Sequence, residues 1–209
     1  MSEYEVQSIE TRTHGRVVVR RGDARRLLVG FHGYAESAET HLGQLVQIAG
    51  SEEWTIAAVQ GLHRFYNRRT PEVVASWMTS QDREAMIDDN LLYVRSAVAS
   101  FGAVDRLVFA GFSQGAAMAY RAAAAILSHG LIILGGDVPP DVVAQERVQL
   151  LPPVLVGRGA TDEWFTGEKL DKDLRFLRAA AERVETCLFD GGHEWTDEFR
   201  GAAGLFLKG

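Results

Sequence analysis

Apolar and polar residues follow one another along this chain in blocks with two different periods. Short apolar runs predict strands, and longer stretches with apolar positions three and four residues apart predict helices. The predicted strands are 16–20, 26–31, 54–59, 107–110, 131–134, 154–156 and 185–189. Helices are predicted after Ser37, over 81–100 and 114–127, and where apolar residues recur at 170–181 and 195–206. Because strands and helices alternate, we expect an α/β fold: a mainly parallel sheet of about seven strands with helices on both faces.

The remaining segments show neither period. Gly61–Ser80 mixes aromatic and arginine side chains, and it is predicted as a loop at the end of a strand. A second loop is predicted around Pro139-Pro140. In the helix after Ser37, the spacing predicts a buried face of Leu42, Leu45, Val46 and Ala49. Since nearly the whole length goes into strands, helices and short loops, we expect no cap domain.

Length and charge narrow the class of protein. The 209 residues suit a single domain over 1–209, and 46% apolar with 24% charged residues is a globular composition. A net charge of −6 argues against nucleic-acid binding and against anionic membranes. The acidic N-terminus is no signal peptide and no apolar run reaches a membrane span, so a cytoplasmic protein without membrane insertion is expected. The only cysteine, Cys187, excludes an internal disulfide.

One stretch carries a chemical motif. Gly111-Phe112-Ser113-Gln114-Gly115 is a G-x-S-x-G that lies between an apolar strand and a helix rich in alanine and methionine. In that context the motif indicates a nucleophile elbow, a sharp turn that lifts a serine hydroxyl clear of the sheet. The turn strains the serine backbone, and its close packing requires very small neighbours, which Gly111 and Gly115 provide. Ser113 is the predicted nucleophile.

A serine nucleophile needs a base, and the base needs an acid that orients it. His193 follows the last predicted strand in a glycine turn, whereas His129, His41 and His63 are interpreted as capping or surface residues. The acid should follow the preceding strand, where Asp162 lies; Asp137, one strand earlier, is the alternative.

The reaction also needs two N–H donors for the oxyanion. We expect the backbone N–H groups of Gln114, directly after the nucleophile, and of Tyr34, in the loop that follows the second strand. Candidate substrate-binding side chains lie in two places at the same end of the sheet: Arg64, Phe65, Tyr66 and Trp77, with Met78, in the 61–80 segment, and Trp164 after the acid. For each of these residues the alternative is a place in a solvated loop whose aromatic side chains pack against the helices.

These motifs together resemble the phospholipase/carboxylesterase family of α/β-hydrolases, whose members include acyl-protein thioesterases. The resemblance rests on four stretches: Gly30-Phe31-His32-Gly33, Gly111 to Ala119, Gly157-Arg158-Gly159 with Asp162, and Gly192-His193-Glu194. It implies a Ser113–Asp162–His193 triad with Tyr34 and Gln114 as oxyanion donors. Three features depart from the family pattern: Tyr34-Ala35-Glu36-Ser37 where glycines are usual, Ala116 where a second glycine is common, and Glu163-Trp164-Phe165 after the acid.

The expected activity is hydrolysis of small to medium carboxylic esters through an acyl-enzyme, without a metal or another cofactor. A thioesterase or lysophospholipase-like hydrolase is the alternative, followed by a peptidase or a non-catalytic binding protein on the same fold. The expected partner is a small-molecule ester, and the sequence leaves a homodimer possible.

Overall fold

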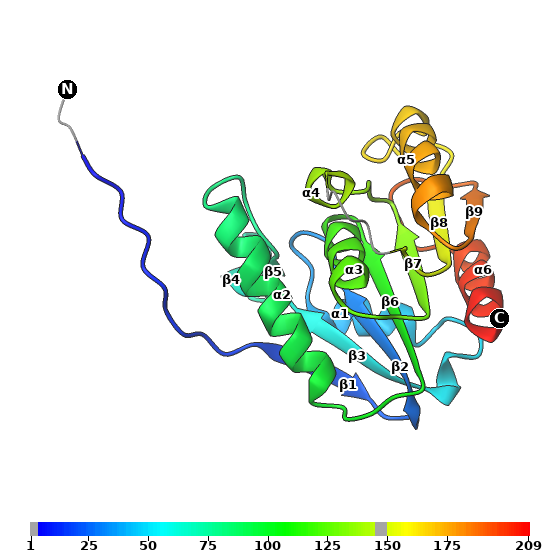
Figure 1. Ribbon diagram of the computed structural model, residues 1–209, viewed down its shortest axis with the longest axis horizontal. Helices are drawn as coiled ribbons and strands as arrows, with labels where there is room; N and C mark the ends of the chain where they lie inside the picture. Colours follow the sequence, from blue (N-terminus) through cyan, green and yellow to red (C-terminus); the bar gives the residue numbers. More distant parts are fainter. Residues whose placement is uncertain (1–3, 145–149) are drawn as a thin grey trace.

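A seven-stranded sheet forms the centre of the molecule. The computed structural model describes residues 4–144 and 150–209 (Figure 1). The strand order is β1-β3-β2-β6-β7-β8-β9; β1 runs antiparallel to β3 and the other neighbours are parallel. The strands are β1 (Arg16–Arg20), β2 (Asp23–Phe31), β3 (Trp54–Gln60), β6 (Arg106–Phe112), β7 (Gly130–Leu134), β8 (Val154–Gly159) and β9 (Val184–Phe189). The prediction of a mainly parallel sheet is confirmed.

Helices cover both faces of this sheet, and each face has its own apolar core. Alternate residues of β2 divide between them, with Val29 in one core and Leu28 in the other, because successive side chains of a strand point to opposite faces. One core contains residues of α2 (Arg83–Ala99), α3 (Gln114–Ala125) and α5 (Gly167–Ala180); the other contains residues of α1 (Ala38–Leu45) and α6 (Asp197–Lys208). Figure 1 shows α2 and α3 together in front of the sheet.

Parallel pairing brings the carboxyl ends of the central strands to one edge. The segments after β2, β6, β7, β8 and β9 therefore start from the same edge, and every residue predicted for catalysis lies in one of them. Ligands of open parallel sheets bind at this edge. The N-terminal residues 4–15 lead into β1, whose first residue, Arg16, pairs with Gln60 at the carboxyl end of β3 (Figure 1).

Two segments predicted as loops contain regular structure. Within 61–80, β4 (His63–Tyr66) and β5 (Val73–Ser76) form an antiparallel hairpin. This hairpin also pairs with the β2–α1 loop through Glu36 and Ala75, a contact between segments too far apart for local periodicity to reveal. The second segment forms the short helix α4 (Pro140–Val143), which Pro140 begins because its fixed φ suits a first helical position.

The first helix is rotated from its predicted orientation. Its buried residues are Ala38, His41 and Leu45, whereas Val46 is 40% exposed. The interpretation of His41 as a surface residue was therefore wrong, because the buried stripe lies one position earlier on the helix. Of the helices in the described ranges, none has both the length and the apolar character needed to traverse a lipid bilayer.

Candidate active site

Ser113 lies at a strained turn between β6 and α3. Its φ of 54° and ψ of −119° place a side-chain-bearing residue in a region that glycine normally occupies. The turn packs very closely: a Cβ on Gly111 would lie 2.4 Å from the carbonyl oxygen of Gly115, and one on Gly115 would lie 2.0 Å from that of Phe31. Both motif glycines are therefore required by space. The result is a half-buried serine at the N-terminus of a helix.

His193 and Asp162 lie beside each other at the same edge of the sheet. The Nδ1 atom of His193 is 2.8 Å from Oδ2 of Asp162, in the loops that follow β9 and β8. The other carboxylate oxygen of Asp162 accepts the backbone N–H groups of Trp164 at 2.8 Å and Phe165 at 2.9 Å. These donors compensate for burying the carboxylate, whose side chain is 1% exposed. With a proton on Nδ1, the bond to Asp162 leaves Nε2 free to accept a proton.

Asp137, the alternative acid, faces a different part of the surface. Its side chain is 57% exposed and lies 3.9 Å from the ammonium group of Lys169. The carboxylate in contact with His193 is that of Asp162.

The β7–α4 segment brings His193 and Ser113 to the same place. A Cβ on Gly135 would lie 2.9 Å from Cε1 of His193, and one on Gly136 would lie 2.6 Å from the backbone oxygen of Ser113. The rings of Phe112 and His193 are also close, with centroids 5.0 Å apart. Within the described residues the Ser113 hydroxyl makes no hydrogen bond. Catalytic hydrogen bonds are often long or poorly aligned in enzymes without substrate.

Tyr34 lies in the β2–α1 loop, which His32 holds in place. The buried His32 ring donates from Nδ1 to the Gly33 carbonyl at 2.7 Å and accepts the Gly61 N–H at Nε2, 2.9 Å away. These two bonds assign the proton to Nδ1, and burial lowers the pKa of His32, so the neutral ring is the favoured form. Sequence reasoning treated His32 only as part of a family motif. In the structure it links the β2–α1 loop to the segment after β3.

The other expected oxyanion donor, Gln114, also has a structural task. Its side-chain oxygen accepts the Trp77 N–H at 3.0 Å, and its side-chain nitrogen donates to the Met78 carbonyl at 2.9 Å. The end of the β4–β5 hairpin is therefore attached to the residue that follows Ser113. The hairpin forms a fixed wall beside the site.

Solved structures share this architecture. An esterase named PE8 has a TM-score of 0.77 at 18% identity, over 94% of this chain and 99% of that one. Acyl-protein thioesterase 2 of Zea mays has a TM-score of 0.76 at 18% identity, over 93% and 98%. The carboxylesterase of Bacillus cereus has a TM-score of 0.70 at 18% identity, over 93% of each chain. No family model matches the sequence, and no curated protein matches it significantly. The chain has the α/β-hydrolase fold.

The predicted substrate-binding residues have different environments. Tyr66 and Trp164 are each 74% exposed, and the Phe65 ring packs on the Tyr34 ring with centroids 5.8 Å apart. Trp77 is fully buried: its indole N–H donates to the His32 carbonyl at 2.9 Å and its ring meets Phe31 edge-on. The interpretation of Trp77 as a pocket wall was therefore wrong, because its large apolar surface is buried in the core.

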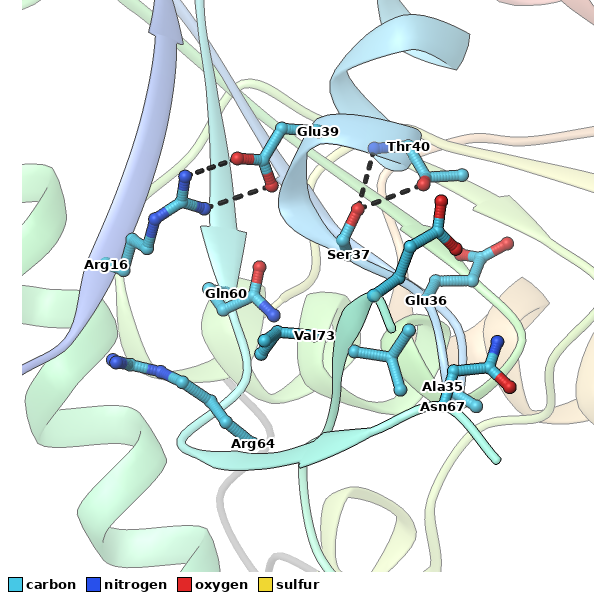
Figure 2. Close-up of a pocket in the computed structure, with 12 residues that line it drawn as sticks. Arg16, Ala35, Glu36, Ser37, Glu39, Thr40, Gln60, Arg64, Asn67 and Val73 are labelled. Atoms are coloured by element: carbon cyan, nitrogen blue, oxygen red, sulfur yellow. Dashed lines mark hydrogen bonds and ion pairs between the residues drawn. The ribbon is translucent and has the colours of Figure 1, made fainter. Parts of the chain in front are cut away.

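A cavity of about 540 Å³ lies between the β2–α1 loop, α1 and the hairpin. Figure 2 shows Arg64 reaching toward this cavity from the hairpin and Glu36 at its border with the β2–α1 loop. Gln60 is 2% exposed and borders the same space; its side-chain oxygen accepts the Ala38 N–H at 2.7 Å. Sequence reasoning had noted Glu36 only as a departure from the family pattern. The sequence offered one indication of its importance: Glu36 is an acidic residue three positions after Gly33, in a loop expected to contact the oxyanion.

Proposed function

We propose that this protein is a serine hydrolase that cleaves carboxylic esters through an acyl-enzyme. One observation carries the proposal: a serine held in a strained strand-to-helix turn lies at the same edge of the sheet as a histidine that is hydrogen-bonded to a buried carboxylate. The esterases and the thioesterase of the same fold support the choice of an acyl-transfer reaction. They also support the phospholipase/carboxylesterase family as the proposed relationship.

The proposed reaction has two halves. The Ser113 hydroxyl attacks the ester carbonyl while its proton passes to Nε2 of His193. The carbon–oxygen bond to the alcohol then breaks, and the alcohol leaves with that proton. Water attacks the acyl-serine, gives a proton to His193, and releases the acid as the Ser113 hydroxyl re-forms. Asp162 orients His193 and stabilises its cation in both halves.

The developing oxyanion needs donors that are already in place. The proposed donors are the backbone N–H of Gln114, at the N-terminus of α3, and the backbone N–H of Tyr34. The positive end of the α3 dipole favours the negative charge at the same position. A cytoplasmic location remains part of the proposal.

A substrate panel tests the reaction class. Chromogenic carboxylic esters, thioesters and anilides should be compared with wild type and with Ser113→Ala, which controls for background hydrolysis. Faster turnover of the carboxylic ester supports the proposal, and faster turnover of the thioester would assign a thioesterase instead. Cleavage of the anilide alone would indicate a peptidase. No Ser113-dependent turnover of any substrate would indicate a binding protein.

The choice of acid leads to a prediction with a matched control. Asp162→Asn should lower kcat/KM by about 10²- to 10⁴-fold, because the amide no longer favours the productive histidine tautomer and no longer stabilises the imidazolium. Asp137→Asn makes the same chemical change beyond the reach of His193 and should stay within about twofold of wild type. Steady-state kinetics on a p-nitrophenyl ester measure both. The opposite ranking would transfer the role of the acid to Asp137.

Substrate size leads to another prediction. The hairpin is tied to the β2–α1 loop and to Gln114, so we expect an open site without a mobile lid. An acyl chain that extends into water gains none of the ~0.8 kcal/mol that burial of each methylene provides. The value of kcat/KM should therefore rise over the first few acyl carbons and then level off, without activation at an oil–water interface.

A series of p-nitrophenyl esters from acetate to palmitate, assayed below and above their solubility limits, measures this dependence. The non-hydrolysing Ser113→Ala variant corrects for detergent-like background. A steep preference for palmitate, or a jump in rate when an emulsion forms, would show that a deep acyl tunnel or a lid exists.

A further inference from the structure

Glu36 is anchored in the β2–α1 loop by its side chain and its backbone. Its Oε2 atom accepts the Gly33 N–H at 2.7 Å, and its own N–H donates to the Gly33 carbonyl at 3.3 Å. Its carbonyl accepts the Ala75 N–H of β5 at 2.9 Å, which ties the loop to the hairpin. Figure 2 shows the side chain where this loop meets the cavity. The carboxylate therefore closes a tight turn around Tyr34.

This turn uses all but one of its backbone donors. The Gly33 N–H goes to Glu36, the Ala35 N–H goes to the Ala75 carbonyl at 3.0 Å, and the Glu36 N–H goes back to Gly33. Within the described chain, Tyr34 alone of residues 33–36 has an N–H without a recorded partner. Ala35 has a φ of 58°, an unfavourable conformation for a residue with a Cβ. A strained loop of this kind needs fixed contacts, and the Glu36 carboxylate supplies one of them.

The environment of the Glu36 carboxyl fits a structural task. Burial raises the pKa of Glu36, and the hydrogen bond from the Gly33 N–H opposes that rise, because it favours the ionised form.

We propose that Glu36 is a positioning residue whose carboxylate holds the β2–α1 loop so that the Tyr34 N–H stays available to the oxyanion. This inference rests on the proposed serine hydrolase activity. Two substitutions test this role, because an amide at position 36 can still accept the Gly33 N–H, whereas alanine cannot.

The test compares Glu36→Gln and Glu36→Ala on p-nitrophenyl acetate at a pH at which wild type is folded. Glu36→Gln should keep the loop, because its side-chain oxygen can accept the Gly33 N–H, and kcat should fall only about two- to fivefold. Glu36→Ala should lower kcat about 10- to 100-fold, with KM changed less than threefold, because the oxyanion loses an aligned donor. Glu39→Ala is the control, because it removes a carboxylate from the same cavity at a residue paired with Arg16.

The outcomes separate this inference from the proposed function. Wild-type kcat in Glu36→Ala would overturn the positioning role, while Ser113-dependent hydrolysis by wild type would still stand. An equal fall of kcat in Glu39→Ala, or an equal fall in Glu36→Gln and Glu36→Ala, would also overturn it. If circular dichroism shows that Glu36→Ala does not fold, kcat of Glu36→Gln is compared with that of Glu36→Met, which has a similar size but no side-chain oxygen. No hydrolysis by wild type would reject the function itself.

Discussion

Replacing Ser113 by alanine is expected to lower ester turnover at least ~10³-fold, because a serine nucleophile and its base act as a unit and the remaining groups cannot replace it. The residual rate should come from the oxyanion donors and from substrate binding alone. Stability should stay within about 1 kcal/mol of wild type, since alanine keeps the Cβ and the variant loses only a hydroxyl that makes no hydrogen bond in the described part of the chain.

Turnover of a p-nitrophenyl ester and unfolding in urea measure the two effects. Ser96→Ala is a matched control, because Ser96 is an exposed serine of α2 whose hydroxyl donates to the Leu92 carbonyl. A fluorescent organophosphonate should label wild type and Ser96→Ala at one site, and should not label Ser113→Ala. An alanine variant with full activity, or labelling at another residue, would remove Ser113 from its proposed role.

Acidification is expected to destabilise this protein through His41. The His41 side chain is fully buried, neither ring nitrogen makes a recorded hydrogen bond within the described residues, and burial lowers its pKa to about 3. The nearby His32 lowers it further, and the backbone of Ala110 opposes the shift. In the unfolded chain the pKa of histidine is ~6.5. Between pH 6.5 and 3, the unfolded chain therefore binds a proton that the folded protein does not.

The sign of the effect follows from this difference. The free energy of unfolding rises with pH wherever the unfolded state binds more protons. Above pH ~6.5 His41 is neutral in both states and costs no stability, and as pH falls below this value its protonation in the unfolded chain lowers the free energy of unfolding. At pH 4 the loss from this one residue is about 3 kcal/mol, a large part of the 5–15 kcal/mol that stabilises a typical protein. His41→Leu should remove this pH-dependent loss. Near neutral pH the stability of the variant should be close to that of wild type, and at pH 4 the variant should be more stable than wild type.

Urea unfolding at a series of pH values measures this prediction as the slope of unfolding free energy against pH. His63→Gln, a change at an exposed histidine of β4, should leave the slope unchanged. His32 is also buried with a lowered pKa, so some acid sensitivity should remain in His41→Leu. Equal slopes in wild type and His41→Leu would mean that His41 is hydrated or protonated in the folded state.

Local pattern was sufficient for most of the fold. Each interior strand of the parallel sheet is apolar on both faces, because helices cover both, and such runs stand out in a sequence; all seven residues of β3 are buried. The elbow was visible as well, since its strand, glycines and helix are contiguous. These features depend on residues within a few positions of one another. They follow from steric limits and from the burial of apolar surface.

Contacts between distant segments decided the rest. The hairpin of β4 and β5 pairs with Glu36 and is attached to Gln114, so its stability depends on partners that its own sequence does not reveal. Trp77 was a plausible pocket residue by type, and only packing against Phe31 and His32 placed it in the core. His41 was misplaced for a related reason: a polar residue type outweighed its helical spacing with Leu45.

The candidate site divides in the same way. From the sequence alone, Ser113 and His193 were predicted by motif and order along the chain, and both remain proposed catalytic residues. Two acids followed suitable strands, and sequence order alone could only favour Asp162 over Asp137. The tertiary structure placed Asp162 against His193 and Asp137 beside Lys169. The position of Glu36 against Gly33 also required the folded loop. The sequence determined which chemical groups are present, whereas their distances and burial depend on how the strand ends converge.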